Sequence, residues 1–577
     1  MSTLYEELRN VIEGEVRFDP YSRALYSTDA SMYRIEPIGV VIPRHTGDVI
    51  ATLDVARRNQ VPVLPRGGGT SLAGQTVGHA IVMDFSKYLH QILEVNTAEG
   101  WARVQPGVIQ DEFNAHLRPM GFLFGPDTST SNRATIGGMI GNNSAGSHSI
   151  AYGKTIDHVL ELTVVLADAS TTVLKPLEKA ELEAKLRGGS LEHRIYREVK
   201  RVVEANRDEI QKRYPTIQRR VSGYNLDAFV RNGEFNLAKL VVGSEGTLAV
   251  VTEAKMRIVP RPKATAVCVA HFRDLIAATE ASEEILACDP YAIELVDRMI
   301  ITLTRGAGEL ARLITFIEGD PEALLIAEFR GDAPAEAQAK AERMIDRLQA
   351  KGMGYAYVRA YAPSQQADVW KVRKAGLGLL ERVEGDRRPV AFVEDTAVDP
   401  LKVPEFLRRF KKIIEDNGTS AGYYGHASVG CLHIRPLINL KEAKDIDLMT
   451  HMAREISDLV MEFGGAMSGE HGDGLARSHW NKKLFGPQLY TAFQDVKLAF
   501  DPLNVMNPGK IVNAPPMTEN LRYGPQYQTI ELKTHFSFEQ EGGFASAVDS
   551  GATAQPSWFK RSMLANRRAR RGVPCSA

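Results

Sequence analysis

Two histidines in the segment YYGHASVGCLHIRP (423–436) are candidate metal ligands. His426 and His433 stand seven positions apart, so on one straight strand their rings would face opposite sides. Small residues lie between them, and these allow a turn that brings both rings together. Neutral imidazole is the commonest side-chain ligand for metals in proteins, so this pair could form half of a metal site.

The segment SGEHGDGLAR (468–477) adds a carboxylate and a further imidazole. Glu470 together with His426 and His433 makes a set of two histidines and one carboxylate, which leaves open positions on a catalytic zinc or manganese. His471 follows directly and could remove a proton near neutral pH. From the spacing alone, separate structural histidines remain the more frequent explanation, by about two to one.

Three glycine-rich segments in the first half of the chain could hold an extended, phosphate-bearing ligand. Successive backbone N–H groups in such loops bind phosphate without a charged side chain. The first segment lacks the third glycine of GxGxxG, because Leu72 stands there, and no Walker A loop is present. On the first segment alone, a ligand cradle and a plain turn are equally good explanations. The segments are PRGGGTSLAGQ (65–75), residues 125–153 and VVGSEGTLAVVTE (241–253).

The bulk composition is that of a globular protein with several domains. The chain has 577 residues, 44% of them hydrophobic and 24% charged, and its net charge of -1 gives no reason to expect a nucleic-acid partner. The N-terminus does not resemble a signal peptide, and no stretch approaches the roughly 20 apolar residues of a membrane span. We therefore expect a cytoplasmic protein. No CxxC spacing occurs, so we expect no zinc ribbon or iron–sulfur cluster from Cys268, Cys288, Cys431 and Cys575.

The elements that must position these residues fall into two groups. The first 260 residues predict a small parallel β-α-β unit and a second lobe of strands. Its helix covers residues 46–60 with Thr46 as N-cap. Later residues predict an α+β region with an antiparallel sheet and helices over 334–351, 404–418 and 445–465. The predicted strands of the first group cover 39–45, 61–65, 80–86, 161–168 and parts of 237–260.

Taken together, the three glycine-rich segments resemble the FAD-binding domain of the p-cresol methylhydroxylase and vanillyl-alcohol oxidase flavoproteins. The resemblance covers roughly residues 20–512. It is greatest to the branch of D-lactate dehydrogenases, glycolate oxidase FAD subunits and D-2-hydroxyglutarate dehydrogenases. It implies an α+β fold class with a two-lobed FAD-binding domain (1–262), an α+β substrate or cap domain with an antiparallel sheet (263–512), and an extended, partly disordered tail (513–577).

The resemblance also implies which residues bind FAD. Relatives with covalently bound flavin carry a histidine in the first glycine loop, and none occurs between Pro65 and Gln75, so we expect non-covalent FAD. The implied pyrophosphate-binding residues are Arg66, Gly67, Gly68, Gly69, Thr70 and Ser71. Those implied to line the flavin and its ribityl chain are Pro126, Asp127, Thr135, Gly137, Gly138, Asn143, Ser144 and Gly146, while Glu245, Gly246 and Thr247 close the site.

In the same family the positions of His426, His433 and Glu470 bind a divalent metal, zinc being our first expectation, and the position of His471 is the base. Arg373 resembles the residue that grips the substrate carboxylate, and Arg435 is its rival. The implied reaction is oxidation of a small D-2-hydroxy acid by hydride transfer to flavin. D-lactate is our first expectation, with D-2-hydroxyglutarate or glycolate as alternatives.

The match departs from the family in two places. Hydroxyglutarate enzymes place a lysine shortly before the position of Asp395, where this chain has Phe392, Val393 and Glu394. The Ala-Ser-Val variant of the histidine loop and residues 521–538 resemble a branch fused to an iron–sulfur domain. We therefore expect a truncated or frame-shifted end after about residue 548, a short native tail being the alternative.

The electron acceptor, on this interpretation, is an external molecule or a separate iron–sulfur or electron-transfer protein. A homodimer and peripheral contact with a membrane stay open. A redox-neutral alkyl-glycerone-phosphate synthase is a rival within the fold, but its multi-histidine run does not occur here. A rival of another class is a non-catalytic flavin-binding subunit that relays electrons, which would have no need of the histidines and Glu470.

Overall fold

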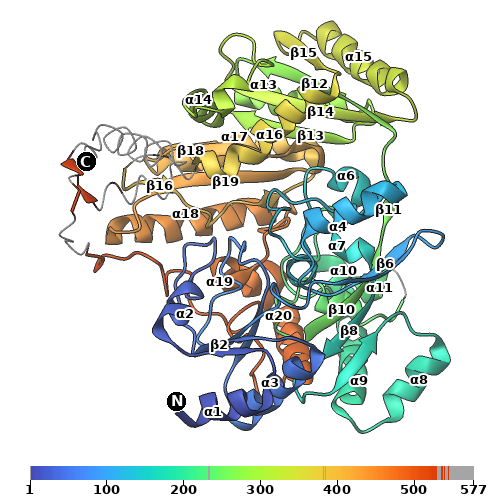
Figure 1. Cartoon of the computed structure of the whole chain (residues 1–577). Coiled ribbons are helices and arrows are strands. Elements are labelled where there is room, and N and C mark those ends of the chain that lie inside the picture. The colour runs from blue at the N-terminus through green and yellow to red at the C-terminus, as the bar shows by residue number, and fades with distance from the viewer. Residues whose placement is uncertain are drawn as a thin grey trace, which may run out of the picture.

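The computed structural model describes residues 2–231, 234–380, 383, 385–528 and seven positions between 535 and 547. Figure 1 shows two regions: the lower one is built largely from the first 260 residues, and the upper one contains the largest sheet. The predicted boundary at residues 262 and 263 stays a prediction, although the strands of the largest sheet begin at Ala264.

The first small sheet contains the predicted parallel unit. Its strand order is β1-β2-β4-β3, in which β4 runs parallel to both β2 and β3. Every residue of β2 and β4 is buried, as expected for parallel strands covered on both faces. The strands are β1 (Glu15–Arg17), β2 (Gly39–Ile42), β3 (Val63–Arg66) and β4 (Ile81–Asp84).

Helix α3 (Thr46–Arg58) connects β2 to β3 and packs against α1 (Ser2–Val11). The sequence prediction of Thr46 as its N-cap is wrong. His45 is the cap, and its ring nitrogen accepts a hydrogen bond from the Asp48 main-chain N–H over 3.3 Å. The Asp48 carboxylate accepts hydrogen bonds from the main-chain N–H groups of Glu13 and Gly14.

The second sheet is antiparallel and has the order β5-β6-β10-β8-β9. Part of the segment predicted as strand is instead the short helix α12 (Ala238–Val241), which precedes the polar turn 243–247. A two-stranded ribbon joins β7 (Phe122–Leu123) to β11 (Val259–Pro260). The sheet strands are β5 (Ile92–Asn96), β6 (Trp101–Val104), β8 (Val159–Val165), β9 (Thr171–Leu174) and β10 (Val250–Arg257).

The remaining helices of the first 231 residues lie in the connections between the strands of these two sheets. Thr135 caps α5 by accepting a hydrogen bond from the Gly138 N–H over 3.2 Å, so the second glycine segment turns into a helix at that residue. The helices are α2 (Pro20–Leu25), α4 (Gln110–Leu117), α5 (Ile136–Asn142), α6 (Ser149–Tyr152), α7 (Thr155–His158), α8 (Lys179–Arg187), α9 (Leu191–Ala205), α10 (Arg207–Arg213) and α11 (Ala228–Arg231).

The largest sheet is antiparallel, as predicted, with the order β15-β12-β14-β13-β18-β19-β16 and β17 paired to β19. Two apolar clusters cover its two faces, one beneath the helices that include α13 and α15, the other beneath α14 and α16. The strands are β12 (Ala264–Phe272), β13 (Ala292–Asp297), β14 (Ala323–Gly331), β15 (Ala356–Ala360), β16 (Arg388–Pro389), β17 (Thr396–Ala397), β18 (Ala421–His426) and β19 (Cys431–Ile438).

The helices of this region follow the predicted ranges closely. Pro404 lies in the first turn of α17, and Gly418, with a left-handed φ of 66°, follows the end of that helix. The helices are α13 (Leu275–Leu286), α14 (Arg298–Arg305), α15 (Pro334–Ala350), α16 (Pro363–Leu380), α17 (Val403–Asp416), α18 (Ala443–Glu462) and α19 (Gly474–Arg477).

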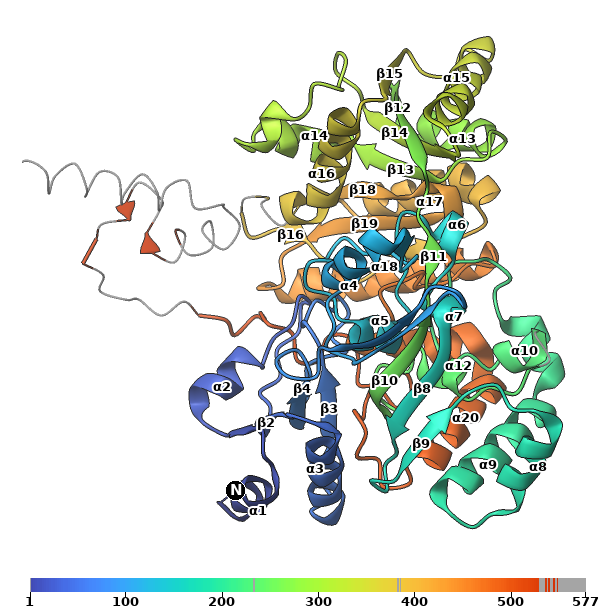
Figure 2. The ribbon, with the colours of Figure 1, turned by 45° about the vertical axis from the view of Figure 1, so that its right-hand side comes forward.

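The last long helix, α20 (Asn481–Phe500), leaves the upper region and packs against α9 in the lower one (Figures 1 and 2). Its buried residues, among them Leu489 and Val496, belong to the same apolar cluster as the strands of the first 260 residues. Beyond it, Val505 and Asn507 form main-chain hydrogen bonds to Val63 in β3. Residues 481–512 therefore complete the core of the first region, although the sequence prediction placed them with the second.

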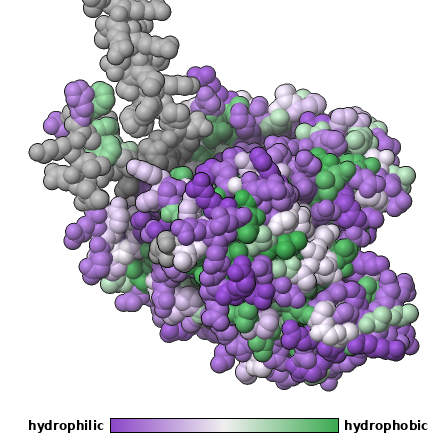
Figure 3. All heavy atoms as spheres, turned by 60° about the horizontal axis from the view of Figure 1, so that its bottom comes forward, coloured by the Kyte–Doolittle hydropathy of each residue, from purple (hydrophilic) through white to green (hydrophobic). Residues whose placement is uncertain are grey.

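The predicted tail lies mostly outside the described residues, as does Cys575. The other three cysteines are buried free thiols. Hydrophilic side chains dominate the face of the lower region seen in Figure 3, with apolar side chains in small groups between them. Within the described part of the chain, every helix is too short or too polar to cross a membrane.

Candidate active site

A single cavity of about 540 Å³ is lined by both sets of candidate residues. The glycine-rich segments of the lower region form one part of its wall. The cluster of histidines and Glu470 from the upper region forms another part, together with Arg373. A ligand bound along the glycine loops can therefore reach the histidine cluster without leaving the cavity.

The first glycine loop lies against the second with no room for side chains. A Cβ atom on Gly67 would lie 2.1 Å from Thr135 Oγ1, and one on Gly68 would lie 2.4 Å from the Arg133 carbonyl oxygen. Gly69 has a left-handed φ of 64°. Bare backbone of this kind fits a cradle for pyrophosphate, because the N–H groups can approach the ligand closely.

Most of the predicted FAD-binding residues line this cavity, and three do not. The Asn143 side chain accepts a hydrogen bond from the Ile156 N–H over 2.9 Å, and the Thr247 hydroxyl donates to the Ser244 carbonyl over 2.6 Å, so both support the backbone. The carbonyl of Pro126 accepts a hydrogen bond from the Gln110 side chain. The lining residues from the prediction are Arg66, Gly67, Gly68, Gly69, Thr70, Ser71, Asp127, Thr135, Gly137, Gly138, Ser144, Gly146, Glu245 and Gly246.

Two of the lining residues, Arg66 and Glu245, form hydrogen bonds with main-chain groups of the protein. The Arg66 guanidinium donates to the carbonyls of Thr28 and Thr76, over 2.8 and 3.0 Å. The Glu245 carboxylate accepts hydrogen bonds from the N–H groups of Asp473 and Gly474, over 2.6 and 2.9 Å. Arg66 thus fixes the walls of the cradle, and Glu245 fixes the loop that carries Glu470 and His471.

A tight hairpin brings His426 and His433 to one face of the largest sheet. Strands β18 and β19 pair Tyr424 with His433, and residues directly opposite each other share a face. His426 lies two positions from Tyr424 on the same strand and so shares that face. The Nε2 atoms of the two histidines are 3.3 Å apart, which confirms that the turn brings the rings together.

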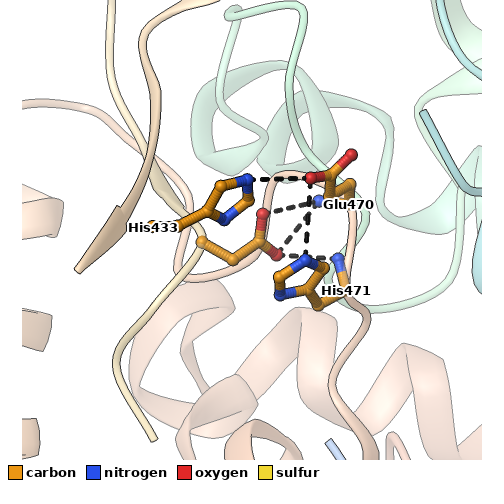
Figure 4. Close-up of side chains that lie close together, drawn as sticks. His433, Glu470 and His471 are labelled. Carbon is orange, nitrogen blue, oxygen red and sulfur yellow. Dashed lines mark hydrogen bonds and ion pairs between the residues drawn. The ribbon is translucent and has the colours of Figure 1, made fainter. Parts of the chain in front are cut away.

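The Glu470 carboxylate lies among three imidazoles. Its Oε1 atom is 3.0 Å from His426 Nε2, 3.1 Å from His433 Nε2 and 3.6 Å from His471 Nε2. Figure 4 shows His433, on a strand, and His471, on the loop, both directed toward Glu470. The other oxygen, Oε2, forms an ion pair of 2.7 Å with the fully buried Arg219.

The charges around this cluster differ between the histidines. Burial disfavours the charged form of His426, but Glu294 and Glu470 outweigh it and raise its pKa to about 9. Burial lowers the pKa of His433 to about 4. Burial also opposes ionisation of Glu470, yet Arg219 and His426 hold its pKa well below the usual range. His433 is therefore neutral and Glu470 anionic near pH 7.

His471 is held between two carboxylates. Its Nδ1 atom lies 2.9 Å from Glu394 Oε1, and its main-chain N–H donates to Asp395 Oδ2 over 2.7 Å. Burial disfavours the imidazolium, but Asp395 and Glu394 together raise the pKa of His471 above its ordinary value. With Nδ1 facing Glu394, Nε2 is the atom that faces Glu470 and the other imidazoles.

Asp395 organises the loop 468–471. Its carboxylate accepts hydrogen bonds from the main-chain N–H groups of Glu470 and His471 and from the Ser468 hydroxyl. Its own φ is 76°, a strained value for a residue with a side chain. Only a weak signal in the sequence marks this role, namely the two adjacent acidic residues Glu394 and Asp395 after an apolar run.

The ligand atoms present fit a divalent metal. Single ligand atoms of Asp395, His433, Glu470 and His471 lie within 4.8 Å of one another. The Asp395 carboxylate already accepts hydrogen bonds from Cys431, Ser468 and the main-chain N–H groups of Glu470 and His471. The predicted ligand His426 lies outside this group of four, although its Nε2 atom is 3.0 Å from Glu470 Oε1, and its role as a ligand stays a prediction. The buried Nδ1 atom of His433 has no hydrogen-bond partner among the described residues, while Nε2 faces the cluster.

Both arginines considered for the substrate carboxylate are paired with buried glutamates. Arg373 on α16 donates from Nε to Glu294 Oε2 over 2.8 Å, and Glu294 also contacts His426. Arg435 is bound to Glu394 in the same manner. Arg373 lines the cavity and Arg435 is not among its lining residues, so the structure favours Arg373. Sequence reasoning missed Arg219 and Glu294, which carry no motif of their own.

Two family models match this chain. The model described as FAD binding domain matches residues 37–175, and the model described as FAD linked oxidases, C-terminal domain, matches residues 261–511. The first covers two of the glycine-rich segments and the second covers the whole histidine cluster. The chain belongs to the FAD-linked oxidases.

Individual members of this family are similar over most of the chain. A D-2-hydroxyglutarate dehydrogenase of Pseudomonas putida is 37% identical over 88% of this chain and 51% of its own length. A D-2-hydroxyglutarate dehydrogenase of Escherichia coli is 34% identical over 85% of this chain and 49% of its own length. A D-lactate dehydrogenase of Archaeoglobus fulgidus is 29% identical over 82% of this chain and 91% of its own length. The chain thus spans about half the length of the hydroxyglutarate relatives.

Solved structures share the fold. The structure of p-cresol methylhydroxylase with substrate bound has a TM-score of 0.64 and 13% identity over 89% of this chain and 96% of that one. The structure of an alkyldihydroxyacetonephosphate synthase has a TM-score of 0.59 and 17% identity over 88% of this chain and 85% of that one. The predicted fold class, a two-lobed FAD-binding fold of the p-cresol methylhydroxylase type with an α+β second part, is confirmed.

Proposed function

We propose that this chain oxidises a D-2-hydroxy acid to the 2-oxo acid, with non-covalently bound FAD and a divalent metal, most simply zinc. The observation that carries the proposal is the shared cavity, in which the glycine cradle and the histidine cluster line one space. A non-catalytic electron-transfer subunit would have no use for three imidazoles converging on a buried Glu470.

The residues suit removal of a hydroxyl proton. His471 Nε2 faces Glu470, and Glu394 holds the opposite ring nitrogen, so the base presents one defined atom to the cavity. Two carboxylates favour the imidazolium in the described arrangement, but the positive charge of a nearby cation would favour the neutral, proton-accepting ring. A metal held by His426, His433 and Glu470 would lower the pKa of the substrate hydroxyl.

The reaction balances as follows. The O–H proton moves to His471, and the C–H bond on the same carbon breaks as the carbon–oxygen double bond forms. FAD would supply the acceptor for that hydrogen and its electron pair. Arg373, which keeps N–H groups beyond those bonded to Glu294, would hold the carboxylate next to the reacting carbon. Regeneration of FAD requires an external electron acceptor.

The relatives change the order of the candidate acids. The sequence prediction put D-lactate first, but the relatives above 30% identity are named D-2-hydroxyglutarate dehydrogenases, and the D-lactate dehydrogenase is more distant. We therefore take D-2-hydroxyglutarate as the first candidate substrate and D-lactate as the second.

Anaerobic flavin bleaching tests the proposal. The full chain, reconstituted with FAD and Zn²⁺, is mixed with D-2-hydroxyglutarate, D-lactate, glycolate and the L-acids, and absorbance near the flavin maximum is followed. We expect bleaching with D-acids and none with the L-acids. Bleaching by none of the acids would overturn the proposed function. Acid precipitation of the same protein should release flavin into the supernatant, whereas flavin retained in the pellet would refute non-covalent attachment.

A further inference from the structure

A second cavity adjoins the first, and we call the first the inner cavity and the second the outer cavity. Its volume is about 520 Å³, and it shares part of the glycine loop and Lys374 with the inner cavity. Helix α16 forms one wall of both cavities, because Arg373 lines the inner one, Lys371 lines the outer one and Lys374 lines both. The shared residues are Gly68, Gly69, Thr70, Leu72, Ser129, Thr130 and Lys374.

Lys374 differs from the other basic residues of the inner cavity. Arg66 is bound to main-chain carbonyls and Arg373 to Glu294. Lys374 is exposed and has no acidic or hydrogen-bonding partner among the residues that the structure describes. Among the lysines and arginines that line the inner cavity, Lys374 is the one without a partner in the described part of the chain, so an anionic ligand could pair with its charge.

Helix geometry separates Lys374 from the site of the chemistry. Consecutive residues of an α-helix are rotated by roughly 100° about its axis, at 3.6 residues per turn. Arg373 points to Glu294, which also contacts His426, and so lies beside the histidine cluster. Lys374 is turned away from that direction, toward the junction with the outer cavity.

From this placement we infer that Lys374 binds the second carboxylate of a dicarboxylic D-2-hydroxy acid and sets the preference for such substrates. The inference rests on the proposed function. The hydroxyl and its adjacent carboxylate occupy the histidine end near Arg373, and the methylene chain extends toward the outer cavity. The segment before Asp395 offers no lysine, with Phe392, Val393 and Glu394 there, so α16 supplies the cation from a different element.

Lysine suits this position. Its ammonium group is a compact point charge on a flexible stem, so it can reach a carboxylate at the rim of a cavity without a fixed geometry. In a partly desolvated cleft an ion pair is weakened less by salt and solvent than on an open surface. A monocarboxylic acid leaves Lys374 solvated in the outer cavity, which costs little free energy.

Lys374→Met tests the inference, with Lys371→Met as the matched control. Both residues are exposed lysines on α16, one turn apart, but only Lys374 lines the inner cavity. The rate constant of anaerobic flavin reduction divided by the apparent Kd is measured for D-2-hydroxyglutarate and D-lactate. We expect Lys374→Met to lower the ratio of these two values by about tenfold, as for loss of a charge-assisted contact. We expect Lys371→Met to leave the ratio unchanged.

A second measurement does not depend on turnover. The expected product, 2-oxoglutarate, is titrated into the oxidised holoenzyme, and its Kd is read from the perturbation of the flavin spectrum. Lys374→Met should raise this Kd about tenfold, whereas the Kd of pyruvate should change by less than about twofold.

Three outcomes would overturn the inference. Loss by the same factor for both acids would place Lys374 at the shared carboxylate, and unchanged values for both acids would show that Lys374 makes no contact with either substrate. Bleaching of the wild-type protein by D-lactate but not by D-2-hydroxyglutarate would show that the dicarboxylic acid is not a substrate, and the inference would fail. Wild-type protein that no acid bleaches would instead overturn the proposed function, so the two failures are distinguishable.

Discussion

The side-chain amide of Asn142 donates a hydrogen bond of 2.8 Å to the main-chain carbonyl of Glu470. Asn142 ends helix α5 in the FAD-binding region, and Glu470 lies on the loop of the histidine cluster. Gln75, next to the glycine cradle, donates to Asn142 over 3.0 Å and to the His471 carbonyl over 2.5 Å. The flavin cradle and the proposed metal site are thus joined by direct side-chain contacts.

Asn142→Ala should therefore loosen the catalytic loop. The substitution leaves the Glu470 carbonyl without its donor, which costs on the order of 1–3 kcal/mol for a buried group. We expect a lower free energy of unfolding by denaturant titration and slower flavin reduction by substrate, with FAD still bound. Asn10→Ala, at an exposed asparagine of helix α1, serves as control. Equal stability and equal reduction rates in the Asn142 variant would show that the contact does not hold the loop.

His471→Ala should keep FAD and lose reduction by substrate. Removal of a general base typically lowers the rate by about 10²–10⁴-fold. Stopped-flow absorbance after anaerobic mixing measures the rate constant, and His451→Ala, at an exposed histidine of α18, is the control. If the His471 variant is bleached at the wild-type rate, another group accepts the proton.

His433→Ala should reduce the metal content of the purified protein. The pKa of His433 is lowered by burial to about 4, so the wild-type ring is a neutral ligand across the working pH range. We expect about one zinc or manganese per chain in the wild type by elemental analysis and much less in the variant, with an intact flavin spectrum. Wild-type protein that is fully active after exhaustive chelation and contains no metal would end the metal hypothesis.

Asp297 should make the fold less stable as the pH rises from about 4 to 7. Burial raises the pKa of this carboxyl from an ordinary value of 3.8 to about 7, although the N–H groups of Ile300 and Tyr423 oppose the rise. The folded state then binds a proton that the unfolded state releases, so stability present below pH 4 is lost through pH 7, at about 1.4 kcal/mol per unit of pKa difference. Asp297→Asn should remove this slope from unfolding free energies measured at several pH values, and an unchanged slope would contradict the assignment.

The sequence predicted those features that depend on local pattern. The parallel β-α-β unit, the helix that begins near Pro404, and the approach of His426 to His433 all follow from spacing and turn residues. The roles of Arg219, Glu294 and Asp395 could not be predicted, because each depends on burial next to a partner distant in sequence. The family resemblance implied that Asn143 and Thr247 bind FAD, whereas the structure uses their side chains to hold the backbone.

Strand β3 is completed by hydrogen bonds from Val505 and Asn507, which enter the chain more than four hundred residues later. During synthesis the N-terminal lobe must therefore wait for almost the whole described chain before it can close its sheet and bury the apolar face of α20. A lobe left open for that time exposes apolar surface and an unpaired strand edge, which makes it a target for chaperones. The lobe that is synthesised first is thus completed by one of the last described segments to be synthesised.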